Sequence, residues 1–364
     1  MPDMTTKPAQ HARTRTRIFY LDLIRAVAAL LIVLTHFNAH LREHGGGYVL
    51  TFEPFGIYLG ALGVSLFLII SGAALTFTYR RPIDLKRFYW KRFLNIYPMF
   101  WTAWVLGTLS LFLVANGRPP NAAPLRSFVF TLLGIDGLAQ AFYFRTMYLL
   151  GEWFLGFILL YYVVFPLLLW AIDRFPVITG AVLLVAYVAT IVIMSRYFPA
   201  YPSAAVLTTR LPELAFGSYF VLYIRRIHGA VVVPAAAVLA VSAMFPGRIP
   251  EDVGTTIVGI SVFLILVVAG RYVAIQPVRA LVSLIATYSY PIFLVHHVVI
   301  EQALEKIDVA GFYPIQRYML LAAEFVLIFA LSVGLEKVSG IVVDFVTTAF
   351  KGMSWRPEVS EAER

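Results

Sequence analysis

The most informative polar residues are an arginine and a histidine inside one apolar segment. LDLIRAVAALLIVLTHFNAH carries Arg25 and His36, eleven residues apart. Eleven residues are close to three turns of an α-helix, so both side chains share one face and lie roughly 16 Å apart along its axis. The pair combines a cation for an anionic ligand with an imidazole for proton transfer. Alternatively, Arg25 extends to one membrane surface and His36 lies at the other interface.

A second apolar segment brings histidines to the same depth. TYSYPIFLVHHVVIE contains His296 and His297, and it crosses a membrane in the same direction as the segment of His36. Imidazoles at one level on two helices favour acid–base chemistry. LLGEWFLGF places Glu152 near this depth. A carboxylate there orients an imidazole, or it is only the solvated end of a span.

A third feature is the basic segment RRPIDLKRFYWKRFLNIYP, which holds six basic residues between Arg80 and Arg92. Such a cluster suits a multiply phosphorylated ligand. The alternative is that its positive charge only keeps a loop in the cytoplasm. The preceding span contains Ser71 and Gly72, whose small size also permits close helix packing.

Arg210 and Glu213 lie three residues apart in TTRLPELAFG, so they can form an ion pair on one helix face. The pair is either structural, beside the helix kink expected at Pro212, or a contact to a substrate.

These residues need membrane helices to position them. Of 364 residues, 60% are hydrophobic and only 13% are charged, against roughly 25% charged in soluble domains. This composition excludes a soluble globular fold and a disordered chain. The chain has no Cys, which excludes a thiol nucleophile and iron–sulfur clusters. We expect an all-α polytopic membrane helical bundle of about ten transmembrane helices, at residues 20–39, 56–79, 94–116, 148–172, 176–198, 203–223, 229–247, 253–270, 280–300 and 318–343.

The basic residues indicate how the bundle is oriented. Most of the 29 Lys and Arg residues fall in segments that are cytoplasmic if the N-terminus is inside. The net charge of +9 therefore reflects membrane topology, and no nucleic-acid partner is expected. The predicted organisation is a cytoplasmic basic tail over 1–18, a membrane domain over 19–345 and a cytoplasmic tail over 346–364. The predicted location is the cell inner membrane, with membrane lipids as partners.

The segments resemble the integral-membrane acyltransferase 3 family in five blocks that follow one another in the family's order. The blocks are LDLIRAVAALLIVLTH, GVSLFLIISG, RFYWKRFLNIYP, EWFLGFILLYYVVFPLL and TYSYPIFLVH. Two positions depart from the family pattern: Asn95 stands where a second Arg is common, and Ile158 where many members have Glu.

The resemblance implies an O-acyltransferase that takes its acyl group from cytoplasmic acyl-CoA. Stand-alone members of this size are similar to exopolysaccharide acetyltransferases. This likeness implies acetyl-CoA as the donor and a sugar hydroxyl of a polysaccharide or lipid-linked oligosaccharide as the acceptor. No metal is expected.

The residues and the resemblance together give each candidate a role. His36 acts as general base or as a transient acyl carrier. The expected catalytic residues are His36, Arg25, Glu152 and His296. The residues expected to bind acyl-CoA are Arg92, Lys91, Arg87, Ser71 and Arg25.

Two other functions stay open at this point. A transporter or flippase for a lipid-linked saccharide also has about ten spans and Pro-interrupted helices. It predicts internal repeats, which the sequence does not contain. A non-catalytic assembly subunit gives no reason for histidines at one depth on separate helices.

Overall fold

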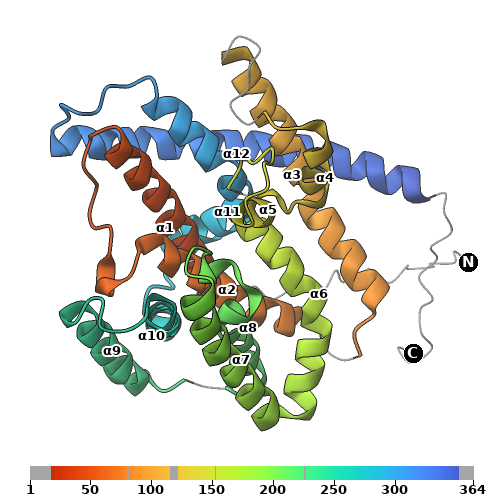
Figure 1. Cartoon of the computed structure of the whole chain (residues 1–364), viewed down its shortest axis with the longest axis vertical. Coiled ribbons are helices and arrows are strands. Elements are labelled where there is room, and N and C mark those ends of the chain that lie inside the picture. The colour runs from red at the N-terminus through yellow and green to blue at the C-terminus, as the bar shows by residue number, and fades with distance from the viewer. Residues whose placement is uncertain (1–17, 80–81, 115–121, 152, 225–226, 352–364) are drawn as a thin grey trace, which may run out of the picture.

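The computed structural model describes residues 18–79, 82–114, 122–151, 153–224 and 227–351. Over these residues the regular structure is helical, and Figure 1 shows the helices gathered into one bundle. The α-helices are α1 (Phe19–Glu43), α2 (Leu59–Thr78), α3 (Leu85–Val114), α4 (Phe128–Leu133), α5 (Asp136–Ala141), α6 (Trp153–Arg174), α7 (Pro176–Tyr197), α8 (Leu207–Tyr223), α9 (Val232–Met244), α10 (Glu251–Tyr272), α11 (Gln276–Leu304) and α12 (Pro314–Lys351).

The predicted all-α membrane fold is confirmed, and each predicted span corresponds to one helix. Among the described residues, 8 helices are long and apolar enough to cross a membrane. The other two predicted spans are shorter helices, with 17 residues in α8 and 13 residues in α9. The chain is therefore a multi-pass membrane protein, and its described part contains eight helices long and apolar enough to cross a membrane.

Helix α2 forms the centre of the bundle. It packs against α1, α8 and α10, while α1 also packs along α11 (Figure 1). The contact between α2 and α8 is close because glycines replace side chains there. A Cβ atom at Gly72 would overlap the carbonyl oxygen of Leu214, and one at Gly217 would overlap that of Ile69. Gly72 therefore serves close helix packing.

Substituting Gly72 by valine should destabilise the fold. The new side chain meets the α8 backbone, which cannot rotate away as a side chain can. Overpacking typically costs about 1–3 kcal/mol, and we expect the free energy of unfolding to fall by an amount at the upper end of this range. Gly340→Val is the matched control, because a Cβ at Gly340 meets nothing within 4 Å. Thermal unfolding in detergent measures both variants. Equal melting temperatures would contradict this account of the α2–α8 contact.

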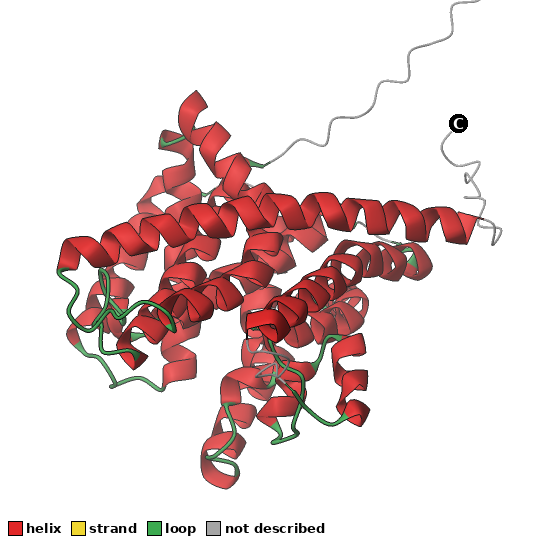
Figure 2. Cartoon of the chain, turned by 90° about the horizontal axis from the view of Figure 1, so that it is seen from above, coloured by secondary structure: helices red, strands yellow, loops and turns green. Residues whose placement is uncertain are grey.

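Helix α12 closes one side of the bundle. In Figure 2 it is the long helix that crosses the molecule towards the C-terminal end, and it packs mainly against α11 and α3. Helix α11 continues through Pro291, so one helix carries Arg279 near its N-terminus and the two histidines in its C-terminal half. The fold thereby holds α11 between α1 and α12.

Candidate active site

A cavity of about 380 Å³ lies where α1 ends and α2 begins. We call it the histidine cavity, and this end of the bundle the histidine end. Its walls come from α1, α2, α6, α8, α10, α11 and the turn Ser203–Ala205. The residues that line it are Ile32, Thr35, His36, Tyr58, Gly60, Ala61, Val64, Phe67, Gly151, Trp153, Phe154, Pro202, Ser203, Ala204, Arg210, Glu251, Asp252, Thr255, Phe293 and His296.

Four histidines from α1 and α11 form a cluster at this cavity. The ring centroid of His36 lies 4.9 Å from that of His296 and 5.1 Å from that of His297. The rings of His40 and His297 are 5.4 Å apart. The packing of α1 along α11 therefore joins the two predicted histidine sites into one histidine cluster.

The bonding of His296 fixes which of its nitrogens can act as a base. Its Nδ1 lies 2.7 Å from the carbonyl oxygen of Phe293 and 3.2 Å from that of Ile292. A carbonyl oxygen only accepts, so Nδ1 carries the hydrogen and donates it. The Nε2 atom is buried and has no hydrogen-bond partner among the described residues. It is thus available to accept a proton or a hydrogen bond.

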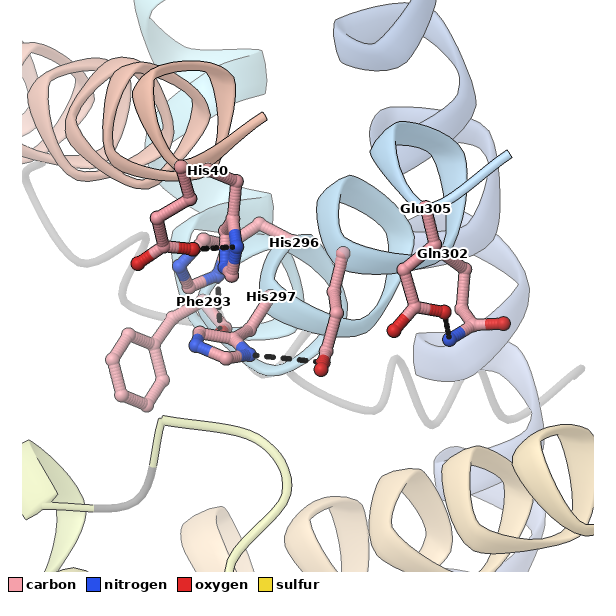
Figure 3. Close-up of polar contacts among 8 residues, drawn as sticks. His40, Phe293, His296, His297, Gln302 and Glu305 are labelled. Atoms are coloured by element: carbon pink, nitrogen blue, oxygen red, sulfur yellow. Dashed lines mark hydrogen bonds and ion pairs between the residues drawn. The ribbon is translucent and has the colours of Figure 1, made fainter. Parts of the chain in front are cut away.

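Two of the four histidines lie next to a carboxylate. The Nδ1 atom of His40 lies 3.0 Å from a carboxylate oxygen of Glu43, and that of His297 lies 3.9 Å from one of Glu301 (Figure 3). Both pairs form along a single helix, at spacings of three and four residues. Glu43 is within hydrogen-bond distance of His40, whereas Glu301 is close to His297 without a hydrogen bond to its Nδ1. His36 and His296 line the cavity.

The α8 and α10 side of the cavity carries a different polar set. Arg210 is buried, and its Nε lies 3.1 Å from Oε2 of Glu213. The Ser203 hydroxyl donates to Asp252 at 2.6 Å. The cavity thus has imidazoles from α1 and α11, and a guanidinium with carboxylates from α8 and α10.

A buried asparagine fixes the segment that joins α1 and α2. The side chain of Asn38 donates to the carbonyl of Val49 at 3.0 Å and accepts from its amide at 2.8 Å. Both backbone groups of one loop residue are thereby satisfied by a helix that also carries His36.

The short helix α5 supports the start of α6, where Trp153 lines the cavity. A Cβ at Gly137 would overlap the backbone of Trp153, so the two segments touch closely. Beside Gly137, the buried Asp136 accepts a hydrogen bond from the Thr131 hydroxyl at 3.0 Å. This contact ties α4 to α5 below the cavity wall.

Asp136 should make stability depend on pH. Burial raises the pKa of Asp136 to about 6, against the hydrogen bonds from Thr131 and the Met147 amide. Between about pH 4 and 6 the folded state holds the proton that the unfolded state has lost, so this group makes stability fall as pH rises through that window. Asp136→Asn should flatten that slope in melting temperatures measured from pH 4 to 7. The exposed Asp308→Asn is the control and should keep the wild-type slope; an unchanged slope in Asp136→Asn would contradict the prediction.

Arg92 lies in an aromatic cage at the opposite end, which we call the basic end. Its guanidinium carbon lies 5.6 Å from the ring centroid of Tyr79, 5.6 Å from that of Tyr162 and 6.0 Å from that of Phe88. One terminal nitrogen donates to the Tyr79 hydroxyl at 3.3 Å. The Nε atom is buried and lacks a hydrogen-bond partner in the described part of the chain.

The other residues predicted to bind acyl-CoA differ in their surroundings. Arg25 lies 3.6 Å from Asp22 and, like Arg92, within electrostatic range of Tyr162. Lys91 is half-buried and Arg87 is exposed. The Ser71 hydroxyl donates to the Phe67 carbonyl of its own helix at 2.7 Å, so its proton is already used.

The structure therefore unites some predicted residues and leaves others apart. His36 and His296 share one cavity, and Arg25 and Arg92 share one neighbour at the basic end. Glu152 lies outside the described residues. Sequence reasoning did not include His40, although its spacing of four from His36 places both on one helix face.

Within the described ranges, no group of three or more metal-ligating side chains is arranged to hold a metal ion.

Comparison with known proteins identifies a family. A family model described as an acyltransferase domain matches residues 18–336. Searches of curated proteins and of solved structures find no match.

Proposed function

Because the chain belongs to the acyltransferase 3 family, we propose that it transfers an acyl group from cytoplasmic acyl-CoA to a sugar hydroxyl. The donor proposed is acetyl-CoA. The acceptor proposed is an exopolysaccharide or a lipid-linked saccharide. The protein works in the cell inner membrane with both termini in the cytoplasm, so that the basic end faces the donor.

The two ends of α1 carry this proposal. Arg25 and the caged Arg92 both lie within electrostatic range of Tyr162 at one end, and His36 lines the cavity at the other. The helix rise separates them by roughly 16 Å. An extended pantetheine arm suits this separation, since it holds the phosphates at the basic end while the thioester reaches the histidine cavity.

One observation supports the binding of a phosphorylated donor at the basic end. The buried Nε of Arg92 lacks a hydrogen-bond partner among the residues described. An unpaired donor on a buried cation is costly unless an anion accepts from it. Arg92 and Arg25 would hold phosphate oxygens, with Lys91 and Arg87 adding positive charge nearby.

The transfer itself needs one base and one leaving group. His36 takes the proton of the acceptor hydroxyl as its oxygen attacks the thioester carbonyl carbon. The new C–O bond forms, the C–S bond breaks, and the proton passes from His36 to the departing thiolate. His296, with its free Nε2, serves as second base or as a hydrogen-bond acceptor for the saccharide. In the variant with a transient acyl-His, a ring nitrogen of His36 attacks the thioester carbon, the C–S bond breaks, and the departing thiolate takes the imidazole proton. The acceptor hydroxyl then attacks the acyl carbon, the C–N bond breaks, and the hydroxyl proton passes to His36.

The direct test uses the purified protein in detergent or liposomes. Acetyl-CoA and a saccharide extract are supplied, and both thiol release and acetyl transfer to the saccharide are measured. We expect the two to appear in equal amounts. Absence of both from protein that is folded and supplied with the surface saccharide of its own cell would contradict the proposal.

A further inference from the structure

Arg210 is a buried cation at the histidine cavity, and the reaction described above gives it no role. Its side chain is 4% exposed. It lines the same cavity as His36 and His296, although it comes from α8. A full positive charge inside a membrane bundle is costly and needs a compensating function or partner.

Glu213, the ion-pair partner of Arg210, engages few of its N–H donors. A guanidinium has five N–H donors in a planar fork, and its pairs with carboxylates are often bidentate. Here Nε lies 3.1 Å from Oε2 of Glu213, without hydrogen-bond geometry. The buried Nε has no hydrogen-bond partner among the described residues. Glu213 balances the positive charge of Arg210. The guanidinium donors that do not face Glu213 remain for a ligand in the cavity that Arg210 lines.

The surroundings decide what kind of group these donors meet. Glu251 and Asp252 line the same cavity, and Glu213 is next to Arg210. Three carboxylates disfavour a ligand that is permanently anionic. They tolerate a neutral saccharide and a neutral thioester, whose carbonyl oxygen becomes negatively charged only during the reaction. Acyl transfer creates such a charge on the carbonyl oxygen of the acyl group.

We propose that Arg210 is a further catalytic residue, which donates hydrogen bonds to the acyl carbonyl oxygen as that oxygen becomes negatively charged. Glu213 positions the guanidinium. The carbonyl electron pair moves to oxygen when the acceptor oxygen bonds to carbon, and it returns when the C–S bond breaks. The hydroxyl proton goes to His36 and then to the thiolate. This inference rests on the proposed acyl transfer.

The experiment compares Arg210→Gln/Glu213→Gln with Glu213→Gln. The double variant removes both charges and leaves no unpaired buried carboxylate, while the single variant keeps the cation. In detergent-purified protein with acetyl-CoA and the saccharide, we expect kcat of the double variant to fall about 10²–10³-fold, as for other oxyanion donors. The KM values for donor and acceptor should stay within a few-fold of wild type. Glu213→Gln keeps the guanidinium but loses the carboxylate that positions it, so its kcat should fall less than that of the double variant, by about tenfold or less.

Wild-type protein in the same assay separates this inference from the proposed function. If the wild type transfers no acyl group, the proposed function fails; if it does, Arg210 alone is tested. A folded double variant with wild-type kcat overturns the inference, and so does a raised acceptor KM at unchanged kcat. Should the double variant not fold, Arg210→Lys serves instead, because an ammonium does not reproduce the planar fork. We expect at least about tenfold lower kcat, and wild-type kcat overturns the inference.

Discussion

Replacing His36 with alanine is expected to lower kcat by about 10²–10⁴-fold, which is the usual contribution of a general base. His36 is the residue of α1 that lines the cavity with its imidazole, and the ring of His296 lies 4.9 Å away. The hydrogen bond from Nδ1 to the Phe293 carbonyl fixes the ring of His296, so its free Nε2 does not move into the position of the His36 imidazole. The measurement is steady-state thiol release from acetyl-CoA with a saccharide acceptor.

His44→Ala is the matched control for this prediction. His44 caps the same helix, is exposed, and is not among the residues that line the cavity. It should keep wild-type kcat. If His36→Ala protein inserts, folds and transfers acyl groups at the wild-type rate, the catalytic assignment of His36 is wrong.

Replacing Arg92 with alanine is expected to raise the KM for acetyl-CoA while the KM for the saccharide stays unchanged. A hydrogen bond to a charged group contributes about 1.5–3 kcal/mol, which corresponds to about 10- to 150-fold in binding. Tyr79 and Tyr162 hold the guanidinium between their rings, so it is ordered before a ligand arrives. Arg92→Lys should restore only part of the affinity, because it keeps the charge and loses the fork.

Arg174→Ala controls for the loss of any arginine at the basic end. Arg174 ends α6, and its guanidinium carbon lies 5.8 Å from the ring centroid of Phe175. Its removal should leave the KM for acetyl-CoA within a few-fold of wild type. An equal change in both variants would mean that general positive charge, and not Arg92, attracts the donor.

The close packing of α2 shows how far a sequence pattern can be interpreted. The pair Ser71–Gly72 predicts either helix packing or a ligand contact. The structure uses Gly72 for packing against Leu214 and the Ser71 hydroxyl for a bond within α2. Both outcomes depend on which helix lies opposite, which a single segment does not encode.

Arg210 shows the same limit for a charged residue. Its spacing of three from Glu213 predicts the ion pair, because i, i+3 residues are neighbours on any α-helix. The spacing does not say whether the pair faces lipid, protein or a cavity. Only the packing of α8 against α2, beside α10, brings Arg210 to the cavity that His36 also lines.

The sequence by itself determined the helical membrane fold and the positions of the eight long spans, because the length and hydrophobicity of a segment are local properties. It also placed Arg25 and His36 on one face, since the helix period alone decides that. Only the tertiary structure decided that His296, and not the adjacent His297, lines the cavity. Neighbouring residues point about 100° apart on a helix, so the rotation of α11 against α1 selects which of the two enters the site.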